Sequence, residues 1–215
     1  MRRFFIFSML LLAGHSGFAQ IGTDRSPWFF EIGANVVDVY PVGENAPQGP
    51  LFDEFFNAND HWNFGIPSAR FGYYFKDDVF VSLRGSFNSI TRWGEFPGQY
   101  SANVNSLNYI GVDAMINKDL KKIFKNENLE PYIAAGFGYT WIHEGAYNSN
   151  SNLEQSLVGA GTLNASIGLK YWISETFGLS IDTTYKHSFE SYLTKHFQHN
   201  FGLIFRFRRT DCDCY

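Results

Sequence analysis

Histidines with polar neighbours are the residues of this chain best suited to chemistry. His187 is followed by Ser188, a base beside a nucleophile, and His196 and His199 are three residues apart. Each group lies in a segment with the alternation of a β-strand, where successive side chains point to opposite faces. The two side chains of each group then lie on opposite faces and cannot act on one substrate or bind one metal ion. We therefore predict no catalytic residue, no metal site and no cofactor. A lipid-modifying site built from His with Ser or Asp on different strands remains the alternative.

A second group of ionisable residues lies on the polar faces of such segments. It holds five cations and three anions: Arg70, Arg84, Lys170, Lys186, Arg206, Glu31, Asp113 and Asp182. If these faces enclose a narrow interior, the charges must pair, because a lone buried charge is costly. We interpret the group as a salt-bridge network that plugs the interior. An ion gate or small pore is the competing interpretation.

Eight segments show period-two alternation and must position these charges. Residues 179–189 illustrate it, with Leu, Ile, Thr, Tyr, His and Phe at odd positions and Ser, Asp, Thr, Lys and Ser at even positions. This predicts His187, and likewise His199 in the last segment, on an apolar outward face. The predicted strands are 28–40, 63–75, 79–90, 105–117, 131–143, 161–174, 179–189 and 197–208.

The connections between these segments alternate in length. Segments 76–78 and 175–178 are tight turns, whereas 41–62, 91–104 and 144–160 are long and rich in polar residues. The charged connection 118–130 departs from this pattern. It could hold one helical turn, but we favour a solvated periplasmic loop. Short turns on one side and longer loops on the other are typical of membrane barrels. We therefore predict an all-β, eight-stranded antiparallel up-and-down barrel.

Composition separates a transmembrane barrel from a soluble secreted barrel that carries a small ligand. Aromatic residues make up 19% of the chain, with 23 Phe and 12 Tyr, which suits a surface that faces lipid. The polar faces carry Ser, Gly, Asn and isolated charges instead of the dense Lys and Glu cover of a water-facing surface. A net charge of −4 gives no support for nucleic-acid binding. We predict a transmembrane barrel.

The two ends of the chain predict processing and termination. Arg2 and Arg3 precede an apolar run over 4–13 that is too short for a membrane-spanning helix. Small residues at Gly17 and Ala19 then form a cleavage site for signal peptidase. We predict a cleaved signal peptide over 1–19, a barrel over 20–208 and a periplasmic tail over 209–215. The tail holds Cys212 and Cys214, which are too close in sequence to staple the fold.

The last predicted strand carries a second kind of signal. Asn200, Gly202, Phe205 and Phe207 form a polar–Gly–aromatic pattern that resembles the insertion signal of outer-membrane barrels. The segments 185–189, 196–199 and 202–207, together with 33–41, resemble the OmpA-type transmembrane barrel. This resemblance implies insertion into the outer membrane by the barrel-assembly machinery. The peptidoglycan-binding domain common in that family has no counterpart before the chain ends at Tyr215.

The first long loop concentrates aromatic residues, which is unusual for a solvated loop tip. These residues are Phe52, Phe55, Phe56 and Trp62. They are a candidate patch for an envelope protein or a surface glycan. A short helix that folds the same aromatics back onto the rim explains them equally well.

These features predict a structural or interaction barrel of the outer membrane that contacts lipid and has no chemistry of its own.

Replacing Phe205 and Phe207 together by Ser should lower the amount of assembled protein, because the apolar edge of the last strand is lost as a pairing signal. Fractionation should then recover the chain from the periplasm. Assembly at the wild-type level would show that this strand is not recognised.

Overall fold

The computed structural model describes residues 25–39, 58–92, 103–124, 128–143, 157–190 and 195–208. The predicted signal peptide, the tail over 209–215 and Phe52, Phe55 and Phe56 of the first loop lie outside these residues. The described residues hold eight long strands and two short helices. None of the described helices has the length and hydropathy that a membrane crossing needs.

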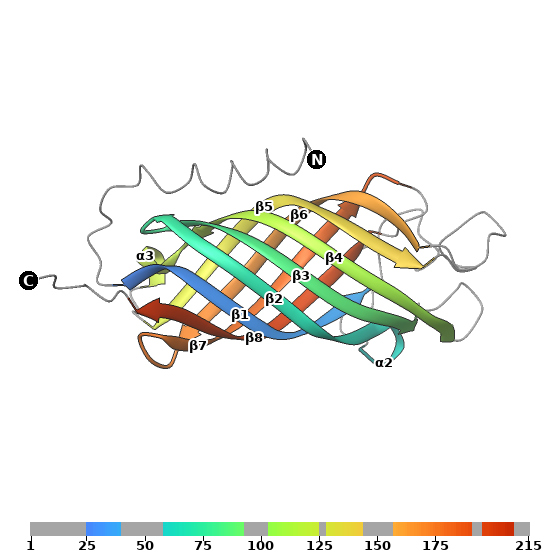
Figure 1. Cartoon of the computed structure of the whole chain (residues 1–215), viewed down its shortest axis with the longest axis horizontal. Coiled ribbons are helices and arrows are strands. Elements are labelled where there is room, and N and C mark those ends of the chain that lie inside the picture. The colour runs from blue at the N-terminus through green and yellow to red at the C-terminus, as the bar shows by residue number, and fades with distance from the viewer. Residues whose placement is uncertain are drawn as a thin grey trace, which may run out of the picture.

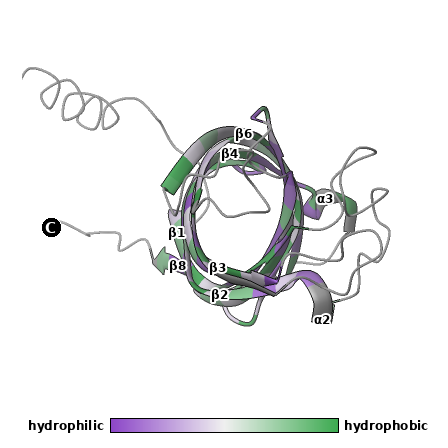
Figure 2. Cartoon of the chain, turned by 90° about the vertical axis from the view of Figure 1, so that its right-hand side faces the viewer, coloured by the Kyte–Doolittle hydropathy of each residue, from purple (hydrophilic) through white to green (hydrophobic). Residues whose placement is uncertain are grey.

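The strands close into one antiparallel barrel in the order β1 to β8, and β8 pairs with β1 (Figures 1 and 2). The predicted fold class is therefore confirmed. The strands are β1 Arg25–Asp38, β2 Trp62–Lys76, β3 Val79–Arg92, β4 Asn103–Asp119, β5 Leu129–His143, β6 Leu157–Trp172, β7 Phe177–Ser188 and β8 His196–Arg208.

The two ends of the barrel differ, as the loop lengths predict. One end, here named the turn end, carries the β2–β3 and β6–β7 turns and α3 (Lys121–Phe124). The opposite end, the loop end, carries α2 (Ala58–His61) (Figure 1). Short turns face the periplasm in outer-membrane barrels, so we expect the turn end on that side.

Side chains alternate between the lumen and the outer surface along each strand. In β3, the even positions from Phe80 to Ile90 are buried, and Val81, Leu83 and Phe87 between them are exposed. Exposed large apolar residues surround the closed barrel, among them Ile32, Phe71, Ile116, Ile133, Phe137, Leu163, Ile167, Ile181, Phe201 and Leu203. An apolar belt outside and polar residues inside define a barrel solvated by lipid.

Aromatic contacts mark both edges of the apolar belt. Near the turn end, the ring of Trp28 lies 5.0 Å from that of Phe71, and Phe177 contacts Phe205. Near the loop end, the rings of Tyr139 and Trp141 are 4.5 Å apart. Aromatic girdles at these two levels are typical of the membrane–water interfaces.

Two apolar clusters lie inside the barrel, one near each end. The loop-end cluster holds Val37, Val39, Ile90, Leu107, Tyr109, Ile142 and Ala160. The turn-end cluster holds Phe29, Tyr74, Phe80, Tyr132, Trp172 and Ile204. The charged residues of the lumen lie between and beside these clusters.

Some strand boundaries were predicted wrongly. β4 extends to Asp119 and β5 begins at Leu129, so both ends of the predicted loop 118–130 belong to strands. The connection that remains between them carries α3. Trp62 was assigned to the first loop but is the first residue of β2. In β4 and β5 the alternation continues past a charged residue, which sequence analysis took for a loop signal.

At Gly202, the backbone of β8 passes close to the side chain of Glu31, which points into the lumen. A Cβ at this position would lie 2.7 Å from Cγ of Glu31. Glycine in a strand often marks such a close approach. Besides its proposed part in insertion, Gly202 therefore leaves room for a charged residue of β1.

Charge placed on the two faces of β6 should have different effects. Ile167 is 66% exposed on the lipid side, and Ile167→Arg should cost about 2–4 kcal/mol near the bilayer midplane. The neighbouring Ser166 faces the lumen, so Ser166→Arg tests packing and charge inside the barrel instead. Folding yields in lipid vesicles measure both effects. If Ile167→Arg folds like the wild type, position 167 does not face lipid.

Candidate functional site: the charged lumen

The centre of the lumen holds two arginines and two carboxylates. Arg84 binds Asp182 with both terminal nitrogens, one of them 2.7 Å from Oδ1. Arg70 binds Glu31 and lies 3.4 Å from Oδ2 of Asp182, and Arg84 lies 3.4 Å from Oε1 of Glu31. Each arginine thus contacts both carboxylates, and all four side chains are buried. A bidentate arginine fixes direction as well as charge.

Strand pairing explains how this cluster forms. Glu31 of β1 pairs with Arg70 of β2, which pairs with Arg84 of β3, so three charges stand in one row of the barrel wall. Asp182 comes from β7 on another part of the wall and completes the cluster across the lumen.

Neutral groups complete the hydrogen bonding of Asp182. The Tyr132 hydroxyl donates to Oδ2 over 3.0 Å, and the Asn200 amide donates to Oδ1 over 2.8 Å. Ser180 accepts a hydrogen bond from Arg70 over 3.0 Å. Such neutral partners offset part of the cost of burying the charges. Asn200, predicted as part of the insertion signal, therefore also serves the lumen.

A second ion pair lies nearer the loop end. Lys186 Nζ is 2.8 Å from Asp113 Oδ2, and Asn164 donates to Asp113 Oδ1 over 2.7 Å. Lys186 also donates to the Tyr109 hydroxyl over 3.3 Å, which in addition lies 2.9 Å from His196 Nε2. This chain of contacts connects the charged lumen to the loop-end apolar cluster.

A third group lies near the turn end. Lys170 Nζ is 3.5 Å from Glu130 and 3.9 Å from Asp119, and Arg206 is 3.5 Å from Glu130. Aromatic rings surround these cations. Lys170 Nζ lies 4.1 Å from the ring centre of Phe80, and the Arg206 guanidinium lies 4.2 Å from that of Trp172. Cation–π contacts strengthen when they are desolvated, as here.

All eight predicted lumen charges lie in the barrel interior, and each has an oppositely charged partner. Sequence analysis missed Asp119 and Glu130, which bring the anions to five against five cations. Asp119 shares the parity of Asp113 in β4, and Glu130 shares that of Tyr132 in β5. Extending the alternation by two residues would have found them.

Little space remains between these side chains. A cavity of about 10 Å³ is bordered by Arg70, Arg84, Asp113, Met115 and Ser166, among others. A volume of this size holds about one water molecule. Within the described residues, no group of three or more His, Cys, Asp or Glu is arranged to hold a metal ion.

The histidines have different surroundings from one another. His196 points into the lumen, whereas His187 lies outside, with its ring 5.2 Å from that of Phe189. His199 lies on the outward face of β8, as predicted, but it is buried, with Nδ1 2.9 Å from the Thr183 hydroxyl and Nε2 3.9 Å from Asp38 Oδ2. Sequence analysis missed Thr183 and Asp38 because they come from other strands.

Thr183, His199 and Asp38 have the residue types of a nucleophile, a base and an acid. The His199–Asp38 distance exceeds that of a hydrogen bond.

The remaining predicted residues lie on the outer surface. Phe205 and Phe207 are exposed in β8, 40% and 53%, as a lipid-facing pairing edge requires. Trp62 is half-buried, and its ring lies 4.9 Å from that of His199. Trp62 therefore packs against the barrel wall instead of projecting into a loop patch.

Comparison with solved structures agrees with this geometry. The outer-membrane protein OprG of Pseudomonas aeruginosa matches with a TM-score of 0.57 at 13% identity, covering 88% of this chain and 100% of OprG. The chain therefore shares the fold of an eight-stranded outer-membrane barrel.

Two further structures support this assignment. Neisserial surface protein A matches with a TM-score of 0.54 at 12% identity, covering 87% of this chain and 100% of that protein. Ail, the attachment invasion locus protein of Yersinia pestis, matches with a TM-score of 0.51 at 15% identity, covering 85% and 99%. No protein-family model and no curated protein matches the sequence. By fold, the chain belongs with the eight-stranded outer-membrane barrels.

Removing Asp182 should destabilise the barrel strongly. Asp182→Ala leaves Arg84 without its bidentate partner, and breaking a buried pair costs about 3–5 kcal/mol. The control is Asp78→Ala, because Asp78 pairs with the half-exposed Lys118 and such pairs contribute about 0–1 kcal/mol. Urea unfolding from lipid vesicles measures both free energies. Equal losses in the two variants would contradict the central role of Asp182.

Proposed function

We propose that this protein is a structural and interaction barrel of the outer membrane, with a lumen closed to ions and no chemistry of its own. The observation that carries the proposal is the pairing of ten buried charges across the lumen, which leaves little space between them. At an effective dielectric constant near 20, opposite charges about 4 Å apart attract by about 4 kcal/mol. Paired side chains are then favoured over a column of water.

The apolar clusters at the two ends add to this closure. A hydrated ion must pass the loop-end cluster before it reaches Lys186, and it must pass the turn-end cluster, whose rings of Phe80 and Tyr132 surround Lys170. Apolar constrictions hinder ions because they do not replace lost water. An eight-stranded barrel is only wide enough for side chains to fill it.

Assembly and partners follow from the surface of the barrel. We propose that the predicted signal peptide directs export and that the assembly machinery recognises Asn200, Gly202, Phe205 and Phe207. The first long loop is our candidate for contact with an envelope protein or surface glycan. A precedent for a glycan is Ail, which has also been solved with the heparin analogue sucrose octasulfate.

Conductance distinguishes this proposal from a small pore. In a planar bilayer, we expect the wild-type barrel to show little or no steady current. Asp182→Ala should open briefly and more often, because it releases Arg84 and Arg70 from a shared partner. Asp78→Ala, at the turn end outside the lumen, should behave like the wild type. A stable, ion-selective current through the wild-type protein would establish a channel instead.

A further inference from the structure

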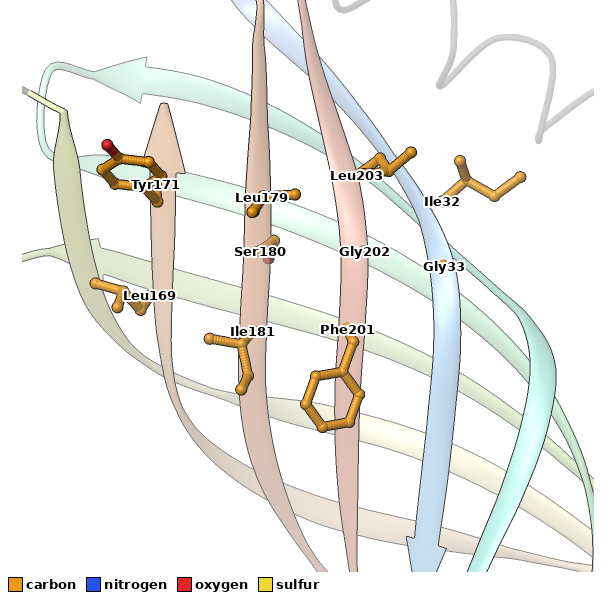
Figure 3. A pocket seen from close by; sticks show the side chains of 10 residues that line it. All are labelled: Ile32, Gly33, Leu169, Tyr171, Leu179, Ser180, Ile181, Phe201, Gly202 and Leu203. Atoms are coloured by element: carbon orange, nitrogen blue, oxygen red, sulfur yellow. The ribbon is translucent and has the colours of Figure 1, made fainter. Parts of the chain in front are cut away.

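Two hollows of the barrel differ in character. A groove of about 650 Å³ lies on the outer wall over β6, β7, β8 and β1, and apolar side chains such as Leu169, Leu179 and Leu203 line it (Figure 3). It belongs to the apolar belt, which lipid covers. The cavity of about 10 Å³ lies in the lumen and is bordered by charged and polar side chains. Of the two, this inner cavity has the lining of a site for a polar molecule.

Two arginines border the inner cavity with an N–H group that has no protein acceptor. Arg70 and Arg84 use their terminal nitrogens to bind Glu31 and Asp182. The Nε atoms of both arginines are buried, and neither has a hydrogen-bond partner among the described residues. A buried donor without an acceptor is costly, and such groups normally bind protein or an ordered water. An acceptor inside the cavity would satisfy both.

Hydroxyl groups add further donors to the border of the cavity. Thr184 donates to Ser166 Oγ over 3.1 Å, and Asn117 donates to Ser82 Oγ over 3.0 Å. Both serines border the cavity, and in each bond the serine oxygen is the acceptor. Each serine O–H can therefore donate to a molecule inside the cavity.

The charges around the cavity favour a water molecule over an anion. The two arginines are balanced by Glu31 and Asp182, and the bordering carboxylate of Asp113 is balanced by Lys186. An anion would add an unpaired buried charge beside Asp113, which is costly. A water molecule adds no charge, can accept two hydrogen bonds and can donate to a carboxylate. A volume of this size with several polar partners suits one buried water.

We propose that the cavity binds one water molecule, which accepts hydrogen bonds from Nε of Arg70 and Arg84 and donates one to Asp113. Asp113 lies opposite Arg84 in the register of β4 and β3, yet the described lumen contains no ion pair between these two side chains. The water therefore connects the central cluster with the Lys186–Asp113 pair. The site goes beyond the proposed closed lumen, because it assigns a ligand to the interior.

Ala134 of β5 tests the need for an acceptor, because its only side-chain atom, Cβ, borders the cavity. Val and Thr have nearly the same shape, so each fills the cavity to the same extent. The Thr hydroxyl can accept a hydrogen bond from an arginine N–H group, whereas Val cannot. In urea unfolding from lipid vesicles, we expect Ala134→Thr to have a higher midpoint than Ala134→Val. Equal midpoints or the reverse order would overturn the proposal.

Val37→Thr is the matched control, because Val37 is buried in the loop-end apolar cluster. There the hydroxyl replaces a methyl group among apolar neighbours, so the midpoint should fall below that of the wild type. A rise at Val37 as well would mean that Thr stabilises the lumen for some other reason, and would overturn the reading of Ala134. Faster gel mobility without boiling confirms that each variant is folded.

Nuclear magnetic resonance in lipid nanodiscs observes the water directly. The Nε–H signals of Arg70 and Arg84 should show dipolar cross-peaks with a long-lived water in the wild type, and these cross-peaks should be lost in Ala134→Val. Exchanging chloride for bromide or sulfate should leave both signals unchanged. Missing cross-peaks in the wild type would show that the cavity is dry, and a halide-dependent shift would assign an anion. Either result would overturn the proposal.

Discussion

The described lumen depends on the carboxylate of Asp182. It binds Arg84 from β3 and Arg70 from β2, and accepts hydrogen bonds from Tyr132 of β5 and Asn200 of β8. With Glu31 of β1 bound to both arginines, one cluster connects six of the eight strands. Backbone pairing joins each strand only to its neighbours, whereas this cluster joins strands across the lumen.

Alternation predicted the eight strands, their order and the face of eight of the ten lumen charges, because a closed barrel has one inside and one outside. The errors lie at strand ends. Asp119 and Glu130 were left in a loop since charged residues usually indicate solvent, but in this barrel charged residues also continue the lumen face. The contacts of Asp38 and Thr183 with His199 could not be predicted, because they depend on register between strands distant in sequence.

Burying ten charges does not make a barrel more stable than packing it with apolar side chains. What the charges supply is specificity. A slip of one residue in any strand would move its lumen charges into lipid and its apolar residues into the lumen. Because each cation has a partner on a different strand, such a slip would also leave the charges of neighbouring strands unpaired. The lumen therefore selects one register among many that backbone hydrogen bonds alone would allow.

The pairing of β7 with β8 shows how both sides of one wall use this register. Asp182 pairs with Asn200 and points inward, and the next pair, Thr183 with His199, points outward. Each pair is joined by a side-chain hydrogen bond. The same register therefore places a charged group at the centre of the lumen and a polar pair on the outer face of the wall. A change that shifted β8 against β7 would disrupt the lumen cluster and the outward pair of Thr183 and His199 together, whereas a single substitution can affect one of them alone.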